Sequence, residues 1–163
     1  MRIATVGIFA ALCFAAALIA KPASALTAKE AEMVVSLLEK LKAQGAEIAY
    51  DEDTAEDLFE RDADESNLIT KAGFNQKSWK TALDGTMKGF FATIPDAEIN
   101  KTFDDARKRM DAAKMTAQQK QALTEMWSEQ REKMAALRAQ GAPFASTVSP
   151  FVARLRKLTL EER

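Results

Sequence analysis

The sequence contains no histidine, and its one cysteine is Cys13, among 163 residues. The absence of histidine excludes histidine-based catalytic triads, a histidine general base and every histidine-ligated metal site. A single cysteine excludes a disulfide framework within the chain and a cysteine-ligated zinc site. Because the usual catalytic and metal-binding groups are missing, we expect a protein that is not an enzyme, with no catalytic residues, no metal and no cofactor.

Glycine and proline are also scarce, with six and four residues. This scarcity excludes collagen-like and low-complexity chains, while a hydrophobic content of 47% permits an ordinary packed core. The 23 basic and 24 acidic side chains give a formal net charge of -1, so the chain has no bulk positive charge to attract nucleic acid. We therefore expect no nucleic-acid partner.

Residues 1–25 have the pattern of a secretory signal peptide. Arg2 supplies a positive start, and residues 3–20 form an uninterrupted run of apolar or small side chains. Pro22 ends the helix that such a run forms. The alternative is an uncleaved anchor, because a run of this length approaches the roughly 20 residues that span a bilayer as a helix.

Small residues mark a cleavage site at the end of this segment. Ala23 and Ala25 form an A-x-A site, so we expect the mature chain to begin at Leu26. This predicts export to a periplasmic or extracellular compartment, with membrane contact only through the segment before cleavage. Removing the segment leaves 21 basic and 24 acidic residues and no cysteine. Packing alone must then support the fold, and we expect residues 26–163 to form one helical domain.

The pattern of apolar residues predicts an all-α fold, a small helical bundle of five to six helices. Apolar side chains recur at the 3.6-residue period, and no segment shows the strict alternation of a strand. Short connections favour antiparallel neighbours. The predicted helix starts are the capping boxes Thr27 to Glu30 and Thr116 to Gln119, a cap at Asp53 or Thr54, the region from Asn75, and the pairs Pro95-Asp96 and Ser149-Pro150, while Gly45, Gly73 and Gly141 mark ends.

Two short segments share a related pattern, Met115-Thr116-x-x-Gln119 and Leu158-Thr159-x-x-Glu162. They resemble the Leu-Thr-x-x-Gln motifs of periplasmic stress chaperones of the Spy and CpxP type. This resemblance covers only these segments and implies a chaperone role in the periplasm. The same pattern is also that of a helix-capping box, which is the interpretation we follow.

The acidic stretch 51–65 overlaps a partial metal-binding pattern. From Asp62 to Thr70, oxygen-bearing side chains occupy four positions of the loop of an EF-hand calcium site, which the segment resembles in part. However, Gly73 stands where the loop needs a bidentate glutamate, and Asn67 stands where it needs a glycine. The segment therefore predicts at most a weak calcium or small-ligand site, and its alternative is a solvated acidic connection.

A row of small side chains lies opposite the apolar stripe of the helix predicted over residues 75–94. Gly85 and Gly89 form a Gly-x-x-x-Gly pattern within this helix, where each glycine costs about 1 kcal/mol relative to alanine. Close approach of a second helix would offset that cost, so this face, with Phe91 at its edge, is a candidate surface for helix packing or for a partner. The alternative is a bend or a tolerated surface position.

Methionine and tryptophan enrich the predicted apolar stripes. Methionine fills irregular core spaces and also suits apolar clefts that accept varied partners. Together with the export signal and the missing catalytic groups, this composition predicts a non-catalytic helical protein that binds another protein or an exposed apolar chain. The sequence leaves the oligomeric state open. The side chains concerned are Trp79, Met87, Met110, Met126, Trp127 and Met134.

Overall fold

The structure is a computed structural model that describes residues 26–51 and 53–159. Within these ranges the chain is all-helical and has no strand, as its periodicity predicts. The predicted signal peptide, with Ala23 and Ala25, lies outside the described residues, as does Glu162 of the second Thr-x-x-Glu segment. None of the helices in these ranges is long and apolar enough to cross a membrane.

Six helices of eight residues or more form the described part of the chain, joined by short helical turns. The six are α1 (Ala28–Ala43), α2 (Thr54–Glu65), α4 (Gln76–Thr93), α5 (Asp96–Ala112), α6 (Ala117–Gly141) and α8 (Val152–Thr159). The short turns are α3 (Leu68–Lys71), α7 (Ala145–Val148) and the 3-10 turns η1 (Ala142–Phe144) and η2 (Ser149–Phe151).

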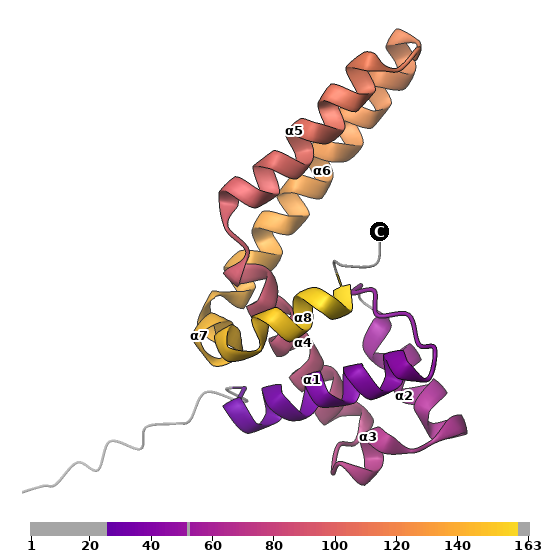
Figure 1. Ribbon diagram of the computed structural model, residues 1–163, viewed down its shortest axis with the longest axis vertical. Helices are drawn as coiled ribbons and strands as arrows, with labels where there is room; N and C mark the ends of the chain where they lie inside the picture. The colour runs from indigo at the N-terminus through magenta and orange to yellow at the C-terminus, as the bar shows by residue number, and fades with distance from the viewer. Residues whose placement is uncertain (1–25, 52, 160–163) are drawn as a thin grey trace, which may run out of the picture.

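The helices are arranged as a body and a projecting arm (Figure 1). Helices α1, α2, α3, α7 and α8 gather around α4, whereas α5 and α6 project together as an antiparallel pair, which we call the arm. Helix α4 packs against α1, α2 and α7 in the body and also against α6. This central helix therefore joins the arm to the body.

The apolar stripe predicted for residues 75–94 forms the centre of the body. Trp79 and Phe90 are completely buried, and the indole nitrogen of Trp79 donates a hydrogen bond to the backbone oxygen of Ala55 at 2.9 Å. The ring of Phe74 meets Trp79 edge-on, with ring centroids 5.8 Å apart. The burial of these side chains confirms the predicted apolar stripe of this helix. The other fully buried large side chains include Val34, Val35, Leu38, Ile69, Leu83, Met87, Val148 and Leu155.

Both predicted capping boxes are present. The backbone N–H of Glu30 donates to the Thr27 hydroxyl at 3.1 Å, and the backbone N–H of Thr27 donates to the Glu30 carboxylate at 2.9 Å. The same reciprocal pair joins Thr116 and Gln119 at the start of α6, at 2.9 and 3.2 Å. Gly45 follows α1 in the left-handed conformation, with φ of 89°. These ends are encoded by residues within one helical turn, which is why the sequence reveals them.

Three predicted helix caps differ from the structure. Asp53 precedes α2, but its side chain makes no capping hydrogen bond, and the carboxylate of Asp51 accepts the backbone N–H of Thr54 instead. Asp96 does not cap α5 but is its first residue, with Pro95 before it, and its carboxylate pairs with the guanidinium of Arg138 on α6. Ser149 does not cap the last helix either, because its own backbone is helical, with φ and ψ of -45° and -41°. The segment Ser149–Phe151 instead forms a 3-10 turn, and α8 begins at Val152.

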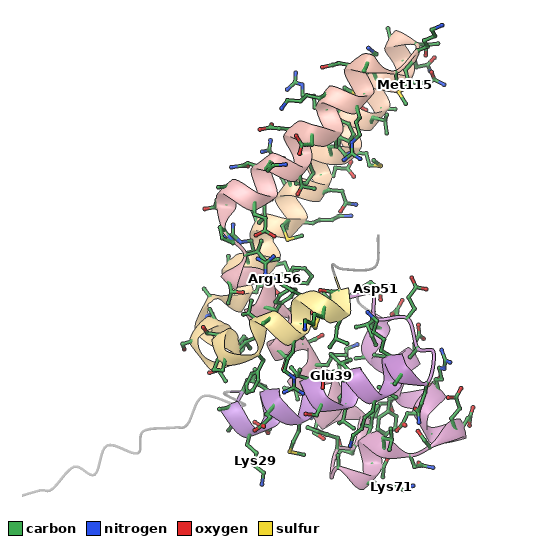
Figure 2. All side chains as sticks on the ribbon, viewed as in Figure 1. Lys29, Glu39, Asp51, Lys71, Met115 and Arg156 are labelled. Atoms are coloured by element: carbon green, nitrogen blue, oxygen red, sulfur yellow. The ribbon has the colours of Figure 1, made fainter. Side chains whose placement is uncertain are left out.

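Helix α8 ties the body to the base of the arm through two arginines. The guanidinium of Arg154 donates to both carboxylate oxygens of Glu39 on α1, at 2.7 and 2.6 Å, and to the Ser36 hydroxyl at 3.1 Å. Arg156 donates in the same bidentate way to Glu98 on α5, with both bonds at 2.8 Å. Figure 2 labels Arg156 and Glu39 along this junction. The hydrogen bonds from Arg156 outweigh burial and lower the pKa of Glu98, so this pair stays charged at neutral pH.

Candidate functional site

The glycine face of α4 is covered by other parts of the same chain. A Cβ atom on Gly85 would lie 3.5 Å from the side chain of Leu26, and one on Gly89 would lie 2.8 Å from Val148. Phe91, at the edge of this face, is half-buried, with its ring centroid 5.8 Å from that of Tyr50. At Gly89 this close packing offsets the helix cost of the glycine, whereas at Gly85 a Cβ atom would be in ordinary van der Waals contact.

Among the described glycines, Gly141 permits the closest approach. A Cβ atom on Gly141, at the end of α6, would lie 1.9 Å from the backbone oxygen of Lys88 on α4. The sequence marks Gly141 only as a helix end, yet the backbone of α6 passes directly into the 3-10 turn η1 there, without a left-handed residue. The glycine is required because backbone meets backbone at this crossing.

The carboxylate of Asp62 holds the start of α3. Its side chain is only 1% exposed, and its oxygens accept hydrogen bonds from the Ser66 hydroxyl at 2.7 Å and from the backbone N–H groups of Leu68 and Ile69 at 2.9 and 2.7 Å. Burial opposes ionisation, but these three donors outweigh it and lower the pKa of Asp62. A calcium ion bound by Asp62 would compete with these donors. Within residues 26–51 and 53–159, no group of three or more acidic side chains is placed to hold a metal.

The arm is the part of the described chain that leaves large apolar side chains exposed. Its two helices contain one buried residue each, Met110 in α5 and Gly141 in α6. Met115 at the tip and Met126 on α6 are 39% and 45% exposed (Figure 2 labels Met115). Trp127, which the heptad-like spacing places in a seam, is half-exposed because only one neighbouring helix covers it. The arm therefore has apolar surface that its own two helices cannot bury.

A groove runs between α5 and α6 on one face of the arm. It consists of two adjoining hollows of about 220 and 280 Å³ that share Arg131. Phe103 and Trp127 line the hollow nearer the tip, and Ile99 and Met134 line the hollow nearer the base. We call this surface the arm groove. Its polar lining comprises Asp96, Asn100, Asp104, Arg107, Thr124, Ser128, Arg131 and Arg138.

Arginine side chains set the electrostatics of the arm groove. The guanidinium of Arg131 lies 5.0 Å from the centroid of the Phe103 ring and donates to the Asn100 side chain at 2.6 Å. Arg138 donates to the backbone oxygens of Phe91 and Ile94 at 3.3 and 3.0 Å, at the end of α4. The groove thus combines planar cations with an aromatic and aliphatic lining, a combination suited to peptide segments.

A larger cleft of about 820 Å³ lies where the base of the arm meets the body. Tyr50 donates a hydrogen bond from its hydroxyl to Asp84 at 3.1 Å in this cleft. Burial, followed by the negative charge of Asp84, raises the pKa of Tyr50 far above its usual range. The phenol is therefore protonated at neutral pH and acts as a hydrogen-bond donor. The remaining lining is Asp51, Lys80, Lys88, Phe91, Gln130, Lys133, Met134, Ala136, Leu137 and Gln140.

Sequence reasoning identified the members of the arm groove only in part. The sequence predicts Trp127 and Met134 as adaptable apolar side chains, whereas it does not single out Arg131 and Phe103 for binding. Phe103 and Arg131 lie on different helices and far apart in the sequence, so their spacing does not predict their contact. The contact depends on how α5 and α6 align. Comparison of the chain with protein-family models, curated proteins and solved structures finds no match.

Proposed function

We propose that this protein is an exported, non-catalytic binding protein that holds apolar segments of other proteins in the arm groove. The observation that carries the proposal is the partial exposure of Phe103, Trp127 and Met134 along a groove on a projecting arm. In a monomeric protein, exposed apolar surface rimmed by polar groups is typical of an interaction site.

The chemistry of the groove favours unfolded or partly folded chains over a single rigid ligand. Methionine and aromatic side chains adapt to apolar groups of different shapes, as chaperone-like binding requires. Arg107 and Arg131 can donate hydrogen bonds to the carbonyl groups or carboxylates of a bound segment. Because these donors surround an apolar lining, backbone and side chains of a bound peptide would both find partners.

Substitution in the groove is expected to weaken this binding. With Trp127→Gln, suppression of the aggregation of a chemically denatured test protein should need about fivefold more of this protein, because a half-buried aromatic anchor is lost. Light scattering measures the effect. Met126→Gln is the matched control, since Met126 lies on the same helix but does not line the groove. Equal suppression by wild type and Trp127→Gln, or none by wild type, would contradict the proposal.

Export is a separate part of the proposal and has its own test. The protein recovered from the envelope or medium of cells expressing the full chain is expected to begin at Leu26, because the Ala23-x-Ala25 pattern fits signal peptidase. N-terminal sequencing or intact mass measures this. An N-terminus at Met1 would instead support an uncleaved anchor.

A further inference from the structure

The connection between α5 and α6 forms the far end of the arm. Helix α5 ends at Ala112 and α6 begins at Ala117, and Figure 1 shows this end as the part of the arm farthest from the body. Met115 lies in the connection and is 39% exposed (Figure 2). Its backbone N–H donates to the Ala113 oxygen at 2.8 Å, and the capping box of Thr116 follows directly. Local hydrogen bonds therefore hold a large apolar side chain at the projecting end.

Basic side chains surround Met115. Residues 108–123, which we call the arm tip, have four basic side chains and one acidic side chain, Asp111. All lie within about 12 Å of the connection along the helix axes, because a helix rises about 1.5 Å per residue. The rest of residues 26–163 has 17 basic and 23 acidic side chains, so the chain is positive at the arm tip and net negative elsewhere. The four basic residues are Lys108, Arg109, Lys114 and Lys120.

The basic side chains of the arm tip remain available to an external partner. Lys114 is exposed and forms no hydrogen bond or ion pair with the residues that the structure describes. The nitrogen of Lys108 lies 3.7 Å from the carboxylate of Asp105, but the lysine side chain is 80% exposed. Lys120 and Arg109 donate to backbone oxygens rather than to carboxylates. An anionic partner can therefore approach these cations directly.

We propose that the arm tip docks end-on against an anionic lipid surface, with Met115 inserted between the headgroups. Lipid phosphates then face the surrounding basic side chains, and the apolar layer beneath them buries the methionine. A nucleic acid offers the negative charge without an apolar layer into which a projecting side chain can insert. Because the contact is end-on, basic residues on every side of the two helices contribute. The sequence alone predicts membrane contact only through the segment before cleavage, so this contact is a second one.

Charge also sets the direction of approach. An anionic surface repels the net negative remainder of the chain and attracts the arm tip, so the arm approaches with its tip first. Helix α5 has 17 residues and is about 25 Å long, which exceeds the ~8 Å over which surface charge acts at physiological salt. The body is therefore held away from the surface. The arm groove lies between the arm tip and the body, and the inference does not depend on peptide binding there.

The expected binding is weak and sensitive to salt. Raising the salt concentration from about 0.05 to 0.5 M should weaken it at least tenfold, because exposed charges are screened. Lys114→Glu should weaken it about twentyfold, since a positive charge is lost from the contact and a negative charge is added. Lys29→Glu is the matched control, because it makes the same change at an exposed lysine of the body and should leave binding unchanged.

Fluorescence at single engineered cysteines tests the contact. The full chain with Cys13→Ala carries either Met115→Cys or Met126→Cys, labelled with a polarity-sensitive dye. Vesicles of phosphatidylcholine with one part in four of anionic phosphatidylglycerol should shift the emission of the dye at residue 115 to the blue, and pure phosphatidylcholine should not. The dye at Met126 is the matched control, since Met126 is comparably exposed but about 16 Å further along the arm. This readout is local, so it holds whether or not residues 1–25 are cleaved.

The outcomes distinguish this inference from the proposed function. No shift at residue 115 up to millimolar anionic lipid, equal shifts of both dyes, or equal binding by Lys114→Glu and Lys29→Glu overturns the docking. A shift with a DNA duplex but not with vesicles assigns the arm tip to nucleic acid and also overturns it. Lys114→Glu should weaken vesicle binding while leaving aggregation suppression intact, whereas Trp127→Gln should do the reverse.

Discussion

Replacing Gly141 by alanine is expected to destabilise the protein by about 3 kcal/mol or more. The added Cβ atom would lie 1.9 Å from the backbone oxygen of Lys88 and 2.3 Å from its carbonyl carbon. No rotamer change can relieve a clash between two backbones, so α6 must move away from α4. Because α4 and α6 join the arm to the body, this movement would also disturb the contacts of Arg138. Urea unfolding followed by circular dichroism measures the loss.

Gly85→Ala is the matched control for this substitution. A Cβ atom at Gly85 would lie 3.5 Å from the side chain of Leu26, which is ordinary van der Waals contact. Since alanine is favoured over glycine within a helix, this variant should be more stable by up to about 1 kcal/mol. If Gly141→Ala unfolded at the same urea concentration as wild type, this result would contradict the close backbone contact of α4 and α6 at Gly141.

Replacing Asp62 by alanine is expected to destabilise the protein by about 3 kcal/mol. The substitution removes the acceptor for the backbone N–H groups of Leu68 and Ile69, and the Ile69 group is buried. A buried donor without a partner costs more than the hydrogen bond contributes to stability. Asp64→Ala removes an exposed carboxylate from the same helix and should change stability by less than about 0.5 kcal/mol.

The acid dependence of stability gives a second measurement on Asp62. Its pKa is lowered in the folded protein from the ordinary value of 3.8, so the unfolded chain binds the proton more readily. The stabilisation is therefore present above the ordinary pKa and is lost as pH falls through the lower folded pKa. Denaturant unfolding between pH 7 and 3 should show a steeper acid loss in wild type than in Asp62→Ala. Parallel curves would show that Asp62 is not the group responsible.

Helix positions and most helix ends were predictable from the sequence because their causes are local. The stripe of Trp79, Leu83 and Met87 follows the helical period, and the boxes at Thr27 and Thr116 involve residues three positions apart. Such patterns depend on contacts within about one helical turn, which the order of residues specifies directly.

The candidate site was predictable only as a composition of adaptable side chains. Whether a methionine becomes core or surface depends on how many helices surround it: Met87 in α4 is buried, whereas Met126 in α6 is exposed. The spacing within each helix is similar, so the sequence alone does not separate the two cases. The projection of the arm, which decides this, follows from the packing of α6 on α4.

By itself the sequence determined an all-helical chain with capped, amphipathic segments and without the histidine and cysteine groups of common active sites. Only the tertiary structure decided that Asp62 caps α3, that Gly141 permits a helix crossing and that Phe103 meets Arg131. The physical reason is the distance along the chain between the residues that interact. Helix formation depends on neighbours along the chain, whereas the burial of a carboxylate, the approach of two backbones and the formation of a groove depend on residues that meet only after the helices pack.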